Sequence, residues 1–158
     1  MKKLNKNFGF TLIELLVVMA IIGILTVIVS GSFVNSQMKS RDSLRKSELK
    51  SLADALNMYY TDLGSFPVTI NFGGEFLGQD GTIYMKKTPS DSKANLGGHL
   101  QFKYVAGSKS FRLYANLENI DDINCNPDCL TGEYNVPSNS GCCYVITSSN
   151  IGVTEALK

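Results

Sequence analysis

The feature that most constrains this chain is an almost entirely apolar run at residues 10–29. Twenty residues of α-helix span about 30 Å, which is the thickness of the hydrocarbon core of a bilayer. The run contains a single ionisable side chain, Glu14, close to its start. An ionised carboxylate in lipid costs roughly 2.5–3.5 kcal/mol on insertion scales. The sequence therefore predicts a membrane-inserted helix in which the carboxylate of Glu14 has a functional role that offsets its cost.

The short segment before the apolar run is basic. Lys2, Lys3 and Lys6 lie in residues 1–9, which contain no acid. Without this segment the chain would have 12 basic and 14 acidic side chains, against 15 and 14 with it, so the net charge of +1 comes from the N-terminus alone. Lysines in this position predict an N-terminus that stays in the cytoplasm. The charge balance of the rest of the chain, 12 basic against 14 acidic side chains, gives no reason to expect a nucleic-acid partner.

Two simpler interpretations of the N-terminus remain. A secretory signal peptide normally has an apolar core of 7–15 residues followed by a small-x-small cleavage site, and neither is present here. A plain single-pass anchor fits the length of the run but gives Glu14 no role.

The helix is predicted to continue through residues 30–63, because apolar residues recur there mostly at intervals of three and four. These residues are Leu44, Leu49, Leu52, Leu56, Tyr59 or Tyr60, and Leu63. Gly64 follows the last of them, and Pro67 follows three residues later, so the helix is expected to end at this point.

Residues 68–98 are rich in Gly, Ser, Thr and Asp, and predict an irregular loop region. Apolar and polar residues then alternate in residues 100–104 and 111–117, which predicts a β-hairpin. Residues 144–147 predict a third strand. The expected fold is α+β, with the amphipathic half of the long helix packed against a small antiparallel sheet and a C-terminal loop that contains the cysteines.

Three parts of the sequence together carry a family resemblance. Gly9 followed by FTLIELLVV (residues 10–18) resembles the N-terminal signature of bacterial type IV pilins and type II secretion pseudopilins. ALNMYY and DLGSFP (residues 55–60 and 62–67) are similar to the end of the long helix in the major pseudopilin, and residues 111–119 are similar to one of its strands. The resemblance is strong over the first third of the chain and poor after residue 119.

The resemblance implies a role for each feature of the N-terminus. Residues 1–9 would be a leader that a prepilin peptidase removes after Gly9, where the absence of a Cβ allows close approach to the backbone. The new N-terminus, Phe10, would then be N-methylated. In an apolar bundle its cationic amine would pair with Glu14 of a neighbouring copy, and this pair would fix the register of assembly. The alternative is that Glu14 reaches water near the headgroups by snorkelling.

The family also implies an organisation and a set of partners. Residues 10–29 would form the transmembrane and filament-core helix, residues 30–63 its amphipathic continuation, and residues 64–158 an extracytoplasmic head. The subunit would wait in the cytoplasmic membrane and then join copies of itself in an extracellular or periplasmic filament. Membrane lipid, the peptidase-methylase, an inner-membrane assembly platform and minor pilins would be its partners. The alternatives are a membrane-anchored, non-polymerising adhesin and a DNA-uptake pseudopilin.

All four cysteines fall late in the chain, at Cys125, Cys129, Cys142 and Cys143. Outside the cytoplasm an even number of cysteines favours disulfides. Because adjacent cysteines pair only with strained geometry, Cys125 and Cys129 are expected to bond to Cys142 and Cys143, in either of two connectivities. A four-thiolate zinc site is the alternative, although its usual Cys-x₂-Cys spacing is missing. Free thiols are the third possibility.

An oxygen-rich cluster accompanies the cysteines and could hold a structural Ca²⁺ ion. Its members are Asp121, Asp122, Asn124, Asn126 and Asp128. The cluster matches neither the EF-hand pattern nor the calcium loop of the family, and these residue types are also common in turns. No other cofactor is indicated. Because no nucleophile–base pair, phosphate-binding loop or metalloenzyme motif is present, the sequence does not predict an enzyme.

Overall fold

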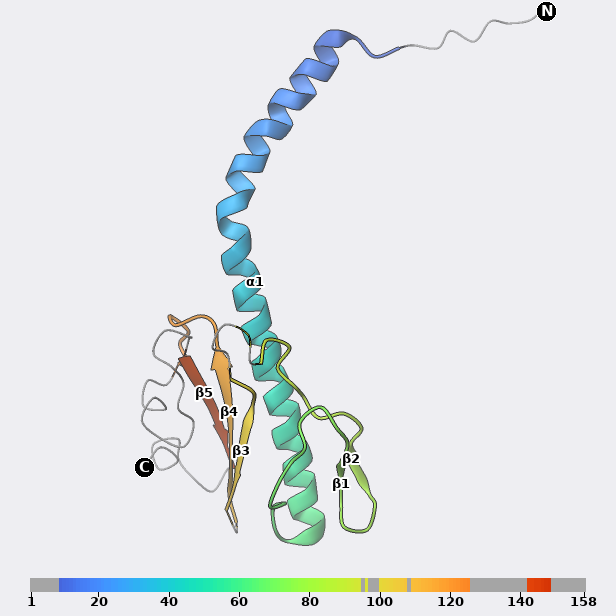
Figure 1. Cartoon of the computed structure of the whole chain (residues 1–158), viewed down its shortest axis with the longest axis vertical. Helices are drawn as coiled ribbons and strands as arrows, with labels where there is room; N and C mark the ends of the chain where they lie inside the picture. Colours follow the sequence, from blue (N-terminus) through green and yellow to red (C-terminus); the bar gives the residue numbers. More distant parts are fainter. Residues whose placement is uncertain (1–8, 95, 97–99, 108, 126–141, 149–158) are drawn as a thin grey trace, which may run out of the picture. The chain divides into compact units, whose positions relative to one another are not determined.

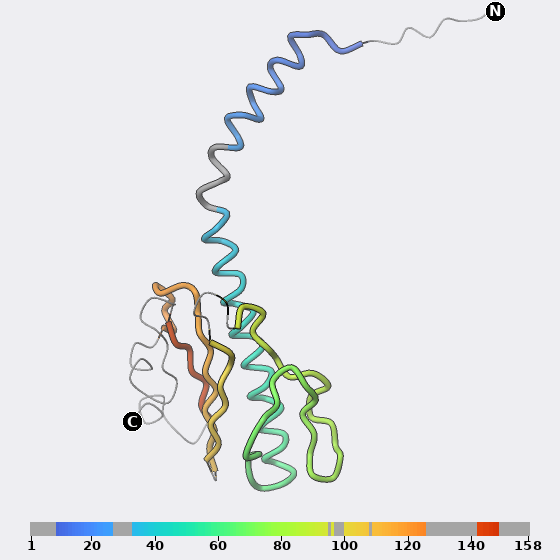
Figure 2. Tube along the Cα trace, in the orientation of Figure 1, coloured from blue at the N-terminus to red at the C-terminus, as the bar shows by residue number. Residues whose placement is uncertain are grey.

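The computed structural model describes residues 9–94, 96, 100–107, 109–125 and 142–148, with the backbone alone described for residues 27–32. The chain divides into two compact units, Met1–Gln37 and Met38–Lys158. The elements in chain order are helix α1, Leu12–Leu63, and five strands named below. Figure 1 shows these elements, and Figure 2 shows the path of the chain between them.

The predicted long helix is confirmed as α1. It ends where the sequence indicates, because Gly64 adopts φ 71° and its N–H donates to the carbonyl oxygen of Tyr60 at 2.8 Å. A residue in this left-handed conformation closes many helices, and glycine adopts it without steric cost. No helix within the described residues is both long and apolar enough to cross a membrane.

Three strands form an antiparallel sheet in the order β3-β4-β5. They are β3, Lys103–Ala106, β4, Phe111–Leu117, and β5, Cys142–Thr147. The register places Tyr104 opposite Leu113 and Leu113 opposite Ile146. The sheet confirms the predicted hairpin and third strand, although β3 begins later than the alternation at residues 100–104 suggested. The side chain of Gln101 accepts hydrogen bonds from the N–H groups of Asp91 and Phe102, which ties this stretch to the preceding loop.

A second, smaller sheet lies in the region for which the sequence predicted only irregular structure. Strand β1, Phe76–Leu77, pairs antiparallel with β2, Ile83–Met85. In the turn between them Gly81 adopts φ 84°, and the carboxylate of Asp80 accepts hydrogen bonds from the N–H and hydroxyl of Thr82. The prediction of a purely irregular loop is therefore wrong, because strands this short carry no detectable alternation.

The core of the second unit lies between α1 and the strands. Leu49, Leu52 and Leu56 of α1 are fully buried and belong to one cluster with Phe111 and Leu113 of β4. The cluster also includes Phe76 of β1, and Phe66 and Phe102 from the connecting segments. In the view of Figure 1, the β3–β5 sheet and the β1–β2 pair lie on opposite sides of this part of α1. The α+β fold predicted from the sequence is thus present.

The apolar stripe of α1 differs from the prediction at its two ends. Leu44 and Leu63 are exposed, at 58% and 40%, whereas Arg45 is only 4% exposed. Arg45 lies four residues before Leu49, so it occupies the buried face of the helix in place of a leucine. The contacts that allow an arginine there are described below.

Candidate functional site

The first turn of α1 contains the predicted carboxylate. The N–H and the hydroxyl of Thr11 donate to Oε2 of Glu14 at 2.8 and 2.7 Å, and the N–H of Glu14 donates to Oγ1 of Thr11 at 3.3 Å. This reciprocal arrangement is a capping box, which satisfies N–H groups that have no partner inside the helix. Within the part of the chain that is described, Oε1 of Glu14 accepts no hydrogen bond. In the single chain Glu14 therefore has a local structural role and one available oxygen.

The apolar side chains around Glu14 are exposed, and no other described part of the chain covers them. Phe10 and Leu12 are 89% and 84% exposed, and every other large apolar side chain up to Leu25 is at least 48% exposed. A contiguous apolar surface of this kind marks a binding surface for lipid or protein. The first part of α1 is thus built to be covered by something other than its own chain.

The predicted cleavage position lies just before α1. Gly9 and Phe10 are exposed and have no helical or strand conformation. A Cβ added at Gly9 would meet nothing within 4 Å. The rest of the predicted leader, residues 1–8, lies outside the described residues. The backbone at the expected cleavage position is thus non-helical and exposed at Gly9 and Phe10.

The cysteines form at least one crosslink between the segment after β4 and β5. Cys125 is bonded to Cys142, with their Cα atoms 5.5 Å apart. This pair belongs to one of the two connectivities that the sequence left open. Cys143 is also disulfide-bonded, and Cys129 lies outside the described residues. The Cys125–Cys142 bond uses two of the thiols that the zinc alternative requires.

The proposed calcium cluster is only partly described. Oδ1 of Asp122 accepts a hydrogen bond from the N–H of Asn124 at 2.9 Å and also binds Nζ of Lys46. The pKa of Asp122 is lowered, first by the hydrogen bond from Lys46. Among the described residues no group of three acidic, histidine or cysteine side chains is placed to hold a metal ion. Asn126 and Asp128 lie outside those residues. The calcium site, in which Asp121 is the remaining predicted ligand, therefore stays a prediction.

A buried ionic cluster, which the sequence did not predict, joins α1 to two distant segments. Arg45 donates to Asp42 at 2.7 Å, to Asp91 at 2.8 Å and to Glu118 at 2.9 Å. Burial lowers the pKa of Arg45, but the hydrogen bonds to Asp91 and Glu118 outweigh this effect and raise it. The cluster consists of Arg41, Asp42, Arg45, Asp91, Lys93 and Glu118.

The same cluster fixes the end of β4 against the helix. The carboxylate of Asp42 accepts the N–H groups of Glu118 and Asn119 at 3.0 and 2.8 Å. The side chains of Asp42, Arg45, Asp91 and Glu118 are at most 9% exposed, while those of Arg41 and Lys93 are 33% and 37% exposed at the edge of the cluster. Three cationic and three anionic side chains thus neutralise one another, as buried charges require. The available signal in the sequence was Arg45 itself, since it falls on the apolar stripe of α1.

Comparisons with known proteins agree with the N-terminal signature. The family model described as "Prokaryotic N-terminal methylation motif" matches residues 4–30. Type II secretion system core protein G of Pseudomonas aeruginosa is 34% identical over 126 residues, which cover 70% of this chain and 83% of the relative. The protein of the same name from Escherichia coli is 32% identical over 106 residues, with 60% and 72% covered.

A pilin shares a shorter stretch. The type IV major pilin protein PilA of Myxococcus xanthus is 44% identical over 57 residues, which cover 36% of this chain and 26% of the relative. No solved structure matches the chain. Because two relatives are matched over more than two thirds of their length, the similarity extends beyond the N-terminal motif. The chain belongs to the family of bacterial type IV pilins and type II secretion pseudopilins.

Proposed function

We propose that this chain is the structural subunit of a helical filament, trimmed after Gly9 and N-methylated at Phe10 before assembly. The observation that carries the proposal is the exposed apolar surface of residues 10–25 around Glu14, in a chain of this family. The longer coverage of the secretion core proteins G favours a secretion pseudopilus over a pilus. The role is structural, and no catalytic role is proposed.

The chemistry of assembly follows from the two partners that Glu14 can have. In the single chain its Oε2 caps the helix through Thr11, while Oε1 is available. Cleavage after Gly9 would create a cationic amine on Phe10. When apolar helices bundle, the amine of one copy would bind the carboxylate of the next, and attraction between them is large where water is excluded. Because desolvation offsets much of this attraction, the pair chiefly sets the register of the copies.

The location and partners follow the same scheme. Residues 10–29 would hold the precursor in the cytoplasmic membrane with the N-terminus inside, as the basic leader favours. A prepilin peptidase would cleave and methylate it, and an assembly platform with minor pilins would receive it. Transfer from lipid into a bundle of copies would keep the apolar surface covered throughout.

Two substitutions at Glu14 separate capping from pairing. Glutamine can replace glutamate in a capping box but carries no charge for pairing. Alanine can neither cap the helix nor form the charge pair. We expect both Glu14→Gln and Glu14→Ala to abolish filaments, measured as pelletable fibres sheared from cells. Thr11→Val, which removes the capping hydroxyl but leaves the charge, is the matched control and should still assemble. Filaments of normal yield from Glu14→Gln would show that Glu14 acts only as a cap.

The processing step has its own readout. Intact-mass spectrometry of subunits from purified filaments should show a chain that begins at Phe10 and carries one added methyl group. Mature filaments built from subunits that still begin at Met1 would contradict the proposed cleavage.

A further inference from the structure

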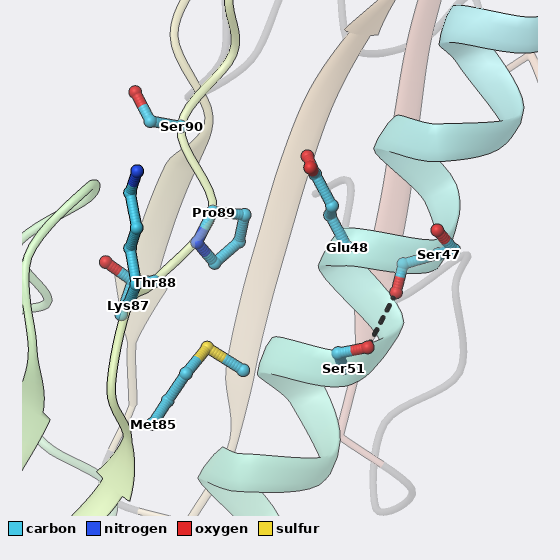
Figure 3. Close-up of a pocket in the computed structure, with 8 residues that line it drawn as sticks. All are labelled: Ser47, Glu48, Ser51, Met85, Lys87, Thr88, Pro89 and Ser90. Carbon is cyan, nitrogen blue, oxygen red and sulfur yellow. Dashed lines mark hydrogen bonds between the residues drawn. The ribbon is translucent and has the colours of Figure 1, made fainter.

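A pocket of about 360 Å³ lies between α1 and the segment that follows β2. It takes no part in the function proposed above. Its walls include Ser47, Glu48 and Ser51 from α1, Met85 at the end of β2, and Lys87 and Ser90 from the segment that follows it. Figure 3 shows the side chain of Glu48 extending from the helix toward Pro89 and Ser90.

Glu48 is the acidic residue in the lining of this pocket, and its side chain lacks a hydrogen-bond or ion-pair partner among the described residues. Its carboxylate is only partly exposed. The nearby guanidinium of Arg45 is already bound to Asp42, Asp91 and Glu118. Burial first, and then the charge of Asp91, raise the pKa of Glu48. The charge of Arg45 lowers the pKa of Glu48 by less than these two effects raise it. A half-buried carboxylate without an ion-pair partner is costly, and an ammonium group bound directly to it would reduce the cost.

The hydroxyls beside Glu48 are able to accept hydrogen bonds. Oγ of Ser47 donates its hydrogen to the carbonyl oxygen of Leu44, and Oγ of Ser51 donates to that of Ser47, as Figure 3 shows for the second bond. Their lone pairs therefore remain for a donor in the pocket. A carboxylate with two acceptor oxygens nearby suits a primary ammonium group, which has three donors and no acceptor.

The same helix carries exposed ammonium groups on its other edge. At 100° per residue, Lys50 and Lys39 lie about 160° and 180° around α1 from Glu48. Both side chains are exposed, and neither makes a hydrogen bond or ion pair in the described part of the chain. Their ammonium groups cannot reach the pocket of their own chain from that side. One edge of α1 thus offers an acceptor site and the other edge offers donors.

A helical filament needs this kind of asymmetry. Copies related by a screw operation meet through two different patches of the same chain, which must be complementary to each other. We propose that the Glu48 pocket receives the ammonium group of a lysine on the opposite edge of α1, Lys39 or Lys50, from a neighbouring copy. This inference rests on the proposed filament function and adds a second contact to it, separate from the one at Glu14.

The test is a charge exchange in the full-length chain, made in cells that assemble the wild-type filament. Glu48→Lys places like charges together, and such juxtaposition costs several kcal/mol, so sheared filaments should fall at least about tenfold. Adding Lys50→Glu or Lys39→Glu to that variant should return the yield to within about twofold of wild type, since the pair is then re-formed in reverse. The lysine whose exchange restores the yield is the partner.

Two controls keep the outcome unambiguous. Lys86→Met removes an exposed ammonium next to the pocket but outside its lining, and should leave assembly unchanged. Glu48→Gln removes the charge with little change of shape, so its subunit should accumulate normally in the membrane while its filaments decrease.

Each result decides the inference. Normal filaments from both Glu48 variants, no rescue by either lysine exchange, or a loss with Lys86→Met equal to that with Glu48→Gln would overturn it and leave the role of Glu14 intact. A wild-type chain that forms no filaments would overturn the proposed function together with this contact.

Discussion

Glu118 shows how individual charges stabilise this protein. Its carboxylate accepts hydrogen bonds from Arg41 at 2.6 and 2.8 Å, from Arg45 at 2.9 Å and from Lys93 at 2.9 Å. The bonds from Arg41 have the largest effect and hold the pKa of Glu118 far below its usual range, although burial opposes them. The ionised form of Glu118 is therefore the form that the folded state prefers.

This preference predicts a specific dependence of stability on pH. Because the pKa is lowered on folding, the contribution of Glu118 is present above its unfolded pKa of about 4.3 and is lost as the pH falls below that value. Glu118→Gln should lower the free energy of unfolding by about 1–3 kcal/mol at pH 7, and the difference from wild type should shrink near pH 2.5. Urea titrations of the full chain in detergent, followed by circular dichroism, measure both quantities.

An exposed acid on α1, Asp54, provides the control for this experiment. Asp54→Asn should change the unfolding free energy by no more than about 0.5 kcal/mol at either pH, as surface substitutions usually do. A difference between wild type and Glu118→Gln that stays constant from pH 7 to pH 2.5 would show that the ionic cluster is not the source of the effect.

At the scale of elements, the end of α1 depends on one glycine. Gly64 adopts φ 71°, and an added Cβ would meet nothing within 4 Å. The cost of a side chain there is therefore that of the left-handed backbone alone. Gly64→Ala should lower the unfolding free energy by about 1–2 kcal/mol, and Gly64→Asn by less, because asparagine tolerates this conformation. Equal stability of all three chains in urea would contradict the assignment.

Local patterns made the elements of this protein predictable. The helix repeats every three to four residues and ends in Gly64, and β4 alternates over seven residues, so both were found from the sequence. Strands β1 and β2 were missed because two and three residues are too few to show a period. The length of an element thus limited what could be inferred about it.

Contacts between distant residues could not be inferred in the same way. Arg45 meets partners 46 and 73 residues away in the chain, and no local pattern records such a pairing. The pocket at Glu48 likewise depends on a segment that folds back against α1. By contrast, the roles expected for Gly9, Phe10 and Glu14 rest on consecutive residues, which is why the N-terminal signature could be read directly from the sequence.

At the scale of the whole molecule, the crosslink between Cys125 and Cys142 limits how far the chain can open. It closes a loop with a sequence separation of 17 residues and ties the start of β5 to the segment after β4. In the chain-entropy description, a loop of this length stabilises the folded state by about 3 kcal/mol, chiefly by restricting the unfolded chain. Under the proposed function, this bond would keep the head, residues 64–158, folded while the helix moves from lipid into the filament.

Replacing both cysteines tests this contribution. Cys125→Ser with Cys142→Ser should lower the unfolding free energy by about 3 kcal/mol, since the double variant leaves no unpaired thiol from this bond. The loss should appear in urea titrations of the full chain in detergent under oxidising conditions. Thr61→Ser, on the exposed face of α1, serves as the control and should change stability by less than about 0.5 kcal/mol. If the double variant unfolds at the same urea concentration as wild type, the loop closed by this bond is already constrained in the unfolded chain, and the crosslink does not hold the head together.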